Sequence, residues 1–222
     1  MCGRYTREYT WAQVHALLSM QEFPLPAIPD PEPSYNVAPT QLGWVIAPDG
    51  AGLLQPAEMR WGIVPLWAKD AKIAYSTINA RVETASTKPA FRGAWKSRRC
   101  LVPASGYYEW PGEGKAKQPY FIHAAEAPVL LFAGLWEPGR GDAAPTYSIV
   151  TRDADGPVAG LHDRMPLMLP RDLARGWVEG SADDAAAIAY AAPLPDLAWH
   201  AVGKAVGNVR NQGRQLIEPI AA

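Results

Sequence analysis

The apolar segments of this chain are short and are bounded by glycine and proline, and this pattern constrains the fold more than any other feature. Two such segments, at 44–47 and 53–59, flank a Pro-Asp-Gly turn, which predicts a hairpin. Further strands are expected at 100–110, 118–124, 128–137 and 146–151. Many strands without repeated strand-helix alternation indicate one α+β domain over residues 1–222, with an antiparallel, sheet-like or barrel-like core and a few flanking helices.

Helical signals lie towards the two ends of the chain. Apolar residues recur at helical spacing between residues 11 and 20, which predicts a helix there. The stretch 22–40 is so rich in proline that we expect no regular structure in it. A short amphipathic helix is predicted at 171–180, and Ser181 with Asp184 three residues later predicts a capping box that opens an alanine-rich helix.

The composition is typical of a globular protein, with 48% hydrophobic and 19% charged residues in a chain of 222. The polar, charged beginning MCGRYTREYT does not resemble a signal peptide, and no apolar run reaches the length of a membrane span. We therefore expect a soluble, cytoplasmic monomer that meets no membrane. The two cysteines and four scattered histidines lack the spacing of zinc sites, so we expect no disulfide, metal or other cofactor.

One local charge cluster stands out against a net charge of −1. The segment KPAFRGAWKSRR, residues 88–99, carries five basic side chains with Phe91 and Trp95 between them. Such a mixture can neutralise phosphates and stack on bases in a nucleic acid. It can equally be a solvated basic face of a helix, which charge runs usually are. The segment by itself does not decide between the two.

The second residue, Cys2, is chemically unusual if the initiator methionine is removed, as is common before a small side chain. One carbon would then bear a free amine and a free thiol. The amine can condense with an aldehyde to an imine, and the thiol can close a five-membered thiazolidine ring. Ordinary pKa values, about 7.7 to 8.0 for the amine and about 8.5 for the thiol, leave little of either reactive at neutral pH, so a neighbouring base would raise the rate. The alternative is a frayed, inert terminus.

Three other stretches carry candidate reactive groups. In TINARVET, Asn79, Arg81 and Glu83 alternate along an expected extended segment and would point to the same side, either to solvent or into a pocket. In SGYYEW, Glu109 lies between aromatic residues, which predicts a raised pKa suited to a general acid or base, unless it is an ordinary edge carboxylate. In GLHDRMP, His162 is either a structural hydrogen-bonding residue or a catalytic one.

Together these segments resemble the SOS response-associated peptidase (SRAP) family of abasic-site processing proteins. The motifs MCGRYT, YNVAPTQ, RWGIVPLWAKD, INARVET, RRCLVPASGYYEW, FAGLWE, TYSIVTRDAD, GLHDRMPLML and VGNVRNQ occur in the expected order from Cys2 to about Ile220. The resemblance implies an SRAP fold and a role in the response to DNA damage. It also implies that the N-terminal cysteine forms a stable thiazolidine crosslink with the ring-opened abasic sugar in single-stranded DNA.

The resemblance also assigns roles to residues of this sequence. Cys2 would be the nucleophile, Asn79 would hold its amine or thiol, Glu109 would shuttle protons, and His162 would act on the sugar oxygen. The resemblance leaves open how Glu109 and His162 divide the proton transfers. The DNA-binding residues it implies are three arginines that contact phosphates, two tryptophans that stack on bases and two residues that line the channel. These are Arg4, Arg81 and Arg164, then Trp67 and Trp110, then Pro39 and Thr151.

Two other functions are consistent with the same residues. Cys2 could be the nucleophile of an N-terminal nucleophile hydrolase that attacks an amide, either in a substrate or only in the bond to Met1. Alternatively, the protein could be a single-stranded DNA-binding module in which Cys2 is incidental. The segment PGEGKAKQ after GYYEW matches no motif, so junction preference does not follow from the resemblance. Partners in the replication machinery cannot be read from the sequence either.

Overall fold

The computed structural model describes residues 2–18, 28–112, 114 and 117–220 and has an α+β architecture with two sheets. The strands are β1 (Tyr5–Arg7), β2 (Ser34–Val37), β3 (Leu42–Pro48), β4 (Leu54–Trp61), β5 (Asn79–Arg81), β6 (Arg99–Ala104), β7 (Gly106–Glu109), β8 (Tyr120–Ala124), β9 (Leu130–Glu137), β10 (Thr146–Asp153), β11 (Arg164–Pro166) and β12 (Leu197–Ala201). The helices are α1 (Trp11–Leu18), α2 (Val82–Ala85), α3 (Arg92–Ser97), α4 (Arg171–Glu179) and α5 (Ala182–Ala191). Short 3-10 helices are η1 (Ala71–Ser76), η3 (Gly156–Gly160), η4 (Lys204–Gly207) and η5 (Arg214–Leu216).

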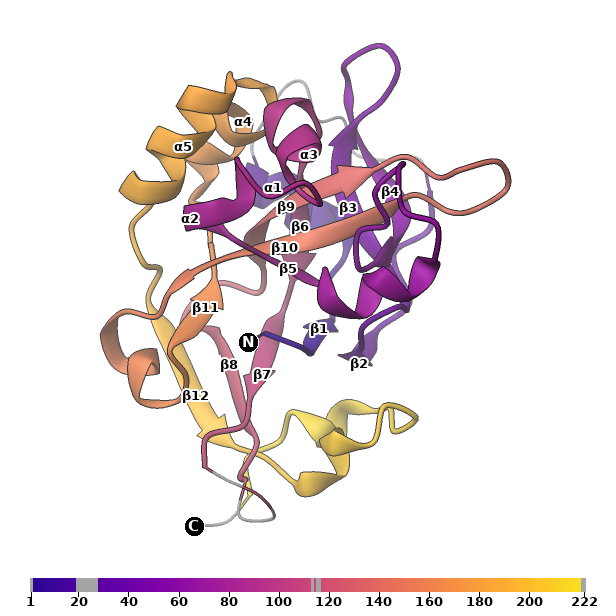
Figure 1. Ribbon diagram of the computed structural model, residues 1–222. Coiled ribbons are helices and arrows are strands. Elements are labelled where there is room, and N and C mark those ends of the chain that lie inside the picture. The colour runs from indigo at the N-terminus through magenta and orange to yellow at the C-terminus, as the bar shows by residue number, and fades with distance from the viewer. Residues whose placement is uncertain (1, 19–27, 113, 115–116, 221–222) are drawn as a thin grey trace.

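The larger sheet closes on itself as a barrel. Its strands follow the order β11-β10-β4-β3-β6-β9, and β10 also pairs with β9, which completes the ring. The predicted hairpin is confirmed, since β3 and β4 pair antiparallel over their whole lengths. Two pairings differ from the antiparallel expectation, because β10 runs parallel to both β4 and β5. The long strand β10 thus pairs with several other strands. Strand β5, which carries Asn79, lies beside the barrel (Figure 1).

The smaller sheet has the order β12-β8-β7-β1-β2. It corrects two sequence predictions. The segment 100–110 is two strands, because the chain leaves β6 of the barrel at Ser105 and enters β7 of the smaller sheet. The proline-rich stretch also contains a strand, β2, whose four residues include no proline and pair with β1. A short gap between prolines is therefore enough for a strand that joins an existing edge.

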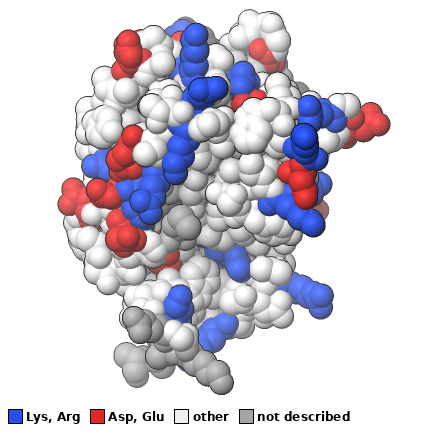
Figure 2. Space-filling model, in the orientation of Figure 1, with Lys and Arg blue, Asp and Glu red and all other residues white. Residues whose placement is uncertain are grey.

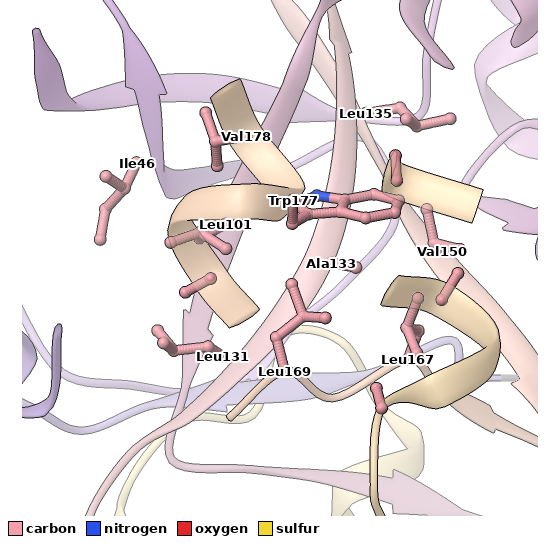
Figure 3. Packing of buried hydrophobic residues seen from close by; sticks show 14 of the residues in the cluster. Ile46, Leu101, Leu131, Ala133, Leu135, Val150, Leu167, Leu169, Trp177 and Val178 are labelled. Carbon is pink, nitrogen blue, oxygen red and sulfur yellow. The ribbon is translucent and has the colours of Figure 1, made fainter. Parts of the chain in front are cut away.

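Four helices, α1, α3, α4 and α5, gather at one end of the barrel (Figure 1). The predicted helices at both chain ends are confirmed within the described residues, and the expected residues 19 and 20 of the first one lie outside them. The capping box of Ser181 and Asp184 is also present. Trp177 of α4 lies among barrel side chains such as Leu135 and Val150 (Figure 3). Burial of these apolar surfaces fixes the helices on the barrel.

Among the described residues, no helix combines the length and the apolar character needed to cross a membrane.

Candidate active site

Cys2 lies in the apolar core that the two sheets share, and no part of its surface is exposed. The amide Nδ2 of Asn79 donates a hydrogen bond to the Cys2 carbonyl oxygen at 2.8 Å. The backbone N–H of Arg4 contacts the Cys2 thiol. These contacts hold Cys2 in place, so it is not a frayed residue, and the strand β1 that follows it pairs with β7 (Figure 1).

Asn79 reaches Cys2 because β5 lies beside β10, with Asn79 opposite Ile149. Its side chain is 9% exposed, and its Oδ1 atom has no hydrogen-bond partner among the described residues. A buried amide oxygen without a donor is costly, so this atom is suited to accept a hydrogen bond from a further group at Cys2.

Glu109 is the last residue of β7 and is 3% exposed. Burial raises its pKa from 4.5 to about 7, which agrees with the effect predicted from its aromatic neighbours. Burial also raises the pKa of the Cys2 thiol, and the charge of Glu109 adds to this shift. The carboxyl group and the thiol are therefore close enough to influence each other, and Glu109 is poised to gain or lose a proton near neutral pH.

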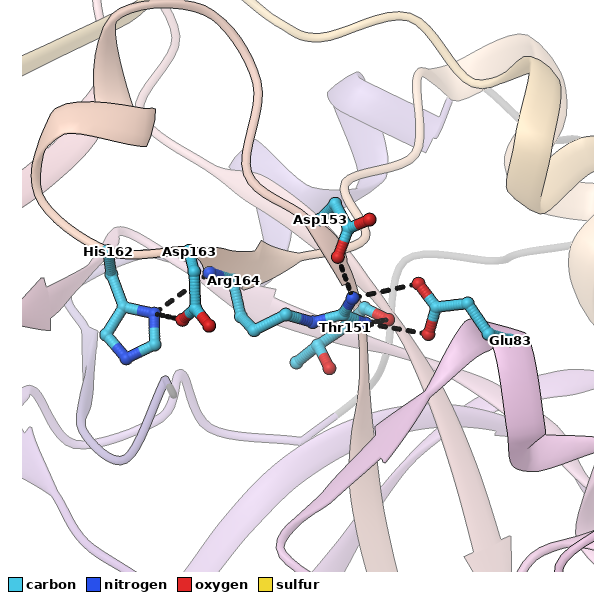
Figure 4. A network of polar contacts seen from close by, with 6 residues as sticks. All are labelled: Glu83, Thr151, Asp153, His162, Asp163 and Arg164. Carbon is cyan, nitrogen blue, oxygen red and sulfur yellow. Dashed lines mark hydrogen bonds and ion pairs between the residues drawn. The ribbon is translucent and has the colours of Figure 1, made fainter.

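His162 lies in the turn before β11, and its Nδ1 atom has two neighbours (Figure 4). The backbone N–H of Arg164 donates to it at 2.9 Å, and a carboxylate oxygen of Asp163 lies at 2.6 Å. Burial lowers the His162 pKa, so the neutral ring is favoured. His162 belongs to the same region as Glu109, because the charge of Asp163 raises the pKa of Glu109.

The expected alternation of Asn79, Arg81 and Glu83 is only partly correct. The strand ends at Arg81, and Val82–Ala85 forms helix α2, which turns Glu83 away from the strand register. Asn79 is buried and Arg81 is exposed, whereas Glu83 pairs with Arg164. An acidic residue in the first turn of a helix suits the helix dipole, so Glu83 favours α2 at this position.

The residues implied to bind DNA fall into three groups. Trp67 is 59% exposed, and Arg81 is also exposed. Trp110 and Pro39 are half-buried. The other three are held by the fold, and they are Arg4, Thr151 and Arg164.

Arg4 lies over the Trp110 ring at 5.8 Å. Its Nη1 donates to Asn36 Oδ1 at 2.5 Å and to the Val206 carbonyl oxygen at 2.9 Å. The fully buried Asn36 also donates to backbone carbonyls in the 206–211 segment. Asn36 was not predicted from the sequence, although an asparagine in the YNVAPTQ motif was a visible signal.

Tyr107 was also missed. Its pKa is raised by burial and further by the charges of Cys2 and Glu109, so it lies close to both. It shares a face of β7 with Glu109, and the period of two in GYYE would have indicated this.

Some basic side chains of the 88–99 cluster are bonded within the fold, and the others are exposed at the surface. Arg99 is buried and donates to the carbonyl oxygens of Trp95 and Trp177. Arg98 pairs with Glu137 at 2.5 Å. The other three basic side chains are exposed, and they are Lys88, Arg92 and Lys96. Figure 2 shows Lys and Arg side chains in a band that runs from the top of this face down to its left side, where Asp and Glu side chains lie beside it.

Among the described residues, no group of three or more His, Cys, Asp or Glu side chains is placed to hold a metal ion.

A family model described as "SOS response associated peptidase (SRAP)" matches residues 1–209. The chain belongs to the SRAP family. It is 39% identical to the abasic site processing protein YedK of Escherichia coli, over 99% of this chain and all of the relative. It is 34% identical to the abasic site processing protein YoaM of Bacillus subtilis, over 98% of each chain. It is also 34% identical to the abasic site processing protein HMCES of Gallus gallus, over 85% of this chain and 66% of that protein.

The SRAP fold is found in solved structures too. A phage-related protein from Bordetella bronchiseptica has a TM-score of 0.73 at 32% identity, over 90% of this chain and 94% of that one. A protein from Bacteroides thetaiotaomicron has a TM-score of 0.79 at 22% identity, over 99% of this chain and all of that one. The predicted fold class and family are therefore confirmed.

Proposed function

We propose that this SRAP protein processes abasic sites by forming a thiazolidine crosslink between Cys2 and the ring-opened sugar in single-stranded DNA. The names of its relatives support abasic-site processing as the broad activity. The observation that carries the finer proposal is the geometry at Cys2, where a fixed residue lies beside a carboxyl group of pKa about 7.

The chemistry begins once Met1 has been removed and the Cys2 amine is free. The amine attacks the aldehyde carbon, and loss of one water gives an imine. The thiol then adds to the imine carbon: a carbon–sulfur bond forms, the carbon–nitrogen π bond breaks, and the thiol proton moves to nitrogen. No oxidant or cofactor is required, and the product is a closed five-membered ring.

Three side chains support these steps. Asn79 accepts a hydrogen bond from the amine through its unpartnered Oδ1 while its Nδ2 holds the Cys2 carbonyl. Glu109 takes and returns protons, for which a pKa of about 7 is well matched at neutral pH. His162 exchanges a proton with the sugar oxygen, so that the closed hemiacetal opens to the aldehyde.

DNA binding comes from the surface around the site. The exposed basic side chains of Arg81, Lys88, Arg92 and Lys96 are suited to contacts with a phosphate backbone. The exposed Trp67 ring offers a stacking surface, worth roughly 1 to 3 kcal/mol per base without sequence preference. An abasic site has no base to unstack, so presenting its sugar costs less than flipping an intact nucleotide.

The test uses mature protein, whose intact mass shows that Met1 is absent, and a single-stranded oligonucleotide with one abasic site. We expect a heat-stable protein–DNA band. The control is the same chain with a residue inserted between Met1 and Cys2 that blocks exposure of Cys2, and it should give no band. Equal crosslinking by the blocked chain would refute the proposal. Turnover of amide substrates without any aldehyde adduct would favour the peptidase alternative.

A further inference from the structure

The side chain of Asn36, in strand β2, joins Arg4 to the segment 206–211 near the C-terminus. It is completely buried. Its Oδ1 accepts a hydrogen bond from Arg4 Nη1 at 2.5 Å, and its Nδ2 lies 3.0 to 3.3 Å from three backbone carbonyl oxygens of that segment. Because the acceptor and the donor side of the amide are both in use, the side chain has one defined orientation.

The Arg4 guanidinium is held by neutral groups within the described part of the chain. Nη1 donates to Asn36 Oδ1 and to the Val206 carbonyl oxygen, and the guanidinium lies over the Trp110 ring at 5.8 Å. These two hydrogen bonds use both hydrogens of Nη1, whereas Nη2 donates to no described residue and keeps two N–H groups for a ligand. Arg98 shows the other arrangement, since its guanidinium pairs with the Glu137 carboxylate.

Arg4 lies next to the proposed reaction centre. Its backbone N–H contacts the Cys2 thiol, and its carbonyl oxygen accepts a hydrogen bond from the Tyr108 N–H at 3.0 Å. The backbone of Arg4 is therefore fixed both towards the chain end and towards β7. In DNA each sugar is joined to phosphates, so a strand whose abasic sugar reaches Cys2 brings a phosphate into the neighbourhood of Arg4.

We infer that Asn36 is a positioning residue for DNA binding: it orients Arg4 with Nη2 towards a DNA phosphate and, being neutral, leaves the charge of Arg4 unpaired for that phosphate. The amide does both because it offers Nη1 an acceptor that carries no charge. A carboxylate in the same place could accept the same bond, but it would pair with the arginine and weaken its attraction for a phosphate. The inference rests on the proposed function, which places single-stranded DNA at Cys2.

A purely structural role for Asn36 is the alternative, because its Nδ2 also fastens the segment 206–211 to β2. Gln212 provides the matched control. Its Oε1 accepts hydrogen bonds from the Tyr35 N–H at 3.0 Å and from the Ser34 hydroxyl at 3.3 Å, so it joins the same strand to the same part of the chain. Within the described residues, Gln212 makes no hydrogen bond to Arg4. Gln212→Ala should therefore loosen the segment and leave Arg4 in place.

The first test is the salt dependence of the Kd for undamaged single-stranded DNA, measured with Asn36→Asp, which changes the charge at this position and nearly keeps its shape. We expect the Kd at low salt to rise by roughly tenfold, and the slope of log K against log salt to fall in magnitude by about 0.7, the value for one phosphate contact on a single strand. The rise in Kd relative to the wild type should grow with pH, because the introduced carboxyl group pairs with Arg4 only after it has lost its proton. Gln212→Ala should keep the wild-type slope. An unchanged slope in Asn36→Asp, or an equal loss of slope in Gln212→Ala, would overturn the inference.

The second test is a double-mutant cycle between Asn36 and Arg4, read out as the same Kd. We expect Arg4→Met and Asn36→Ala each to raise the Kd by roughly tenfold, and the double variant to bind within about twofold of Arg4→Met, because Asn36 acts through Arg4. Effects that multiply in the double variant would overturn the inference. If Asn36→Ala does not fold, Asn36→Ser takes its place in the cycle, and Asn36→Asp still carries the first test.

Both tests use undamaged DNA, so they do not depend on crosslinking. A wild type that binds DNA but forms no crosslink would refute the proposed chemistry, and the two tests would still decide the role of Asn36. A wild type that crosslinks, together with an Asn36→Asp variant that keeps the wild-type salt slope, would leave the proposed function standing and refute this inference alone.

Discussion

The two cysteines of this protein are both buried, but they differ in the polar groups that surround them. Both are free thiols in the same apolar cluster, and burial raises the pKa of each. At Cys100 burial is the one cause of the shift, and its neighbour across the sheet is Gly134. At Cys2 a carboxyl group, a backbone N–H and the Asn79 amide are added. Burial by itself makes a thiol inert, so the polar partners distinguish the proposed reactive residue from a packing residue.

The largest expected difference between the two cysteines is in crosslinking to abasic DNA. Cys2→Ala should lose the crosslink completely, because both reacting atoms depend on that residue. Cys100→Ala should crosslink at the wild-type rate after allowance for a small loss of stability. The measurement is a denaturing gel with a labelled abasic oligonucleotide. Loss of the band in Cys100→Ala as well, with the fold intact, would remove the distinction between the two sites.

Glu109 supplies the second difference. Glu109→Gln should slow crosslinking by about 100-fold, within the usual range for loss of a general acid or base, and should leave the affinity for undamaged DNA unchanged. The rate profile near pH 7 should flatten in the variant, because the titrating group is gone. Quenched time courses between roughly pH 5.5 and pH 8.5, on both sides of the Glu109 pKa of about 7, measure the crosslinking rate and its pH profile. An unchanged profile would exclude Glu109 as the proton carrier.

The same carboxyl group should make stability depend on pH. Its folded pKa of about 7 exceeds its ordinary value of 4.5, so the folded state holds its proton more tightly than the unfolded state does. The free energy of unfolding should therefore fall as the pH rises from 4.5 to 7, by up to about 3 kcal/mol. Glu109→Gln should lack this decrease. Urea unfolding at both ends of that range provides the test.

On the Cys100 side, the tight contact with Gly134 predicts an effect on stability only. A Cβ atom on Gly134 would lie 2.7 Å from the Cys100 sulfur. Gly134→Ala should therefore destabilise the protein by about 1 to 3 kcal/mol, as overpacking does, and should leave crosslinking unchanged below its Tm. Thermal unfolding and the gel assay measure the two properties. A crosslinking defect in this variant, at a temperature where it is folded, would show that packing at Cys100 affects the reaction at Cys2.

The smallest expected effect is at Asn79. Asn79→Ala removes the hydrogen bond to the Cys2 carbonyl and the proposed one from the Cys2 amine, each worth about 1 kcal/mol, so crosslinking should slow by roughly 5- to 30-fold. Initial rates under single-turnover conditions detect such a change. A loss as large as that of Cys2→Ala would show that Asn79 takes part in the chemistry more directly than through positioning.

The sequence predicted the elements that depend on local patterns. The hairpin of β3 and β4, the helix at Trp11–Leu18 and the capping box at Ser181 follow from periodicity and turn residues, and the structure confirms them. The raised pKa of Glu109 was also predicted, because its aromatic neighbours are adjacent in sequence.

Features that depend on long-range contacts were not predictable in this way. The division at Ser105 arises because the next strand pairs with β1 of a different sheet. The Arg164–Glu83 pair joins residues 81 positions apart, and neither local pattern indicates the other. The family resemblance implies a phosphate contact for Arg164, but the bonds of its guanidinium to Glu83, Asp153 and Thr151 could not be read from the sequence. The hydrogen-bond partner of each guanidinium N–H group can be assigned only in the folded structure.

The most direct test of the account is to identify the atoms that join the protein to the abasic sugar. Mature protein is crosslinked to the abasic oligonucleotide without reductant, digested, and analysed by tandem mass spectrometry and NMR. We predict one adduct, on the N-terminal Cys2 peptide, with the summed mass of the two reactants minus one water and with nitrogen and sulfur bound to the same sugar carbon. An adduct on Cys100 or on a lysine, or one that survives only after reduction of an imine, would contradict the account.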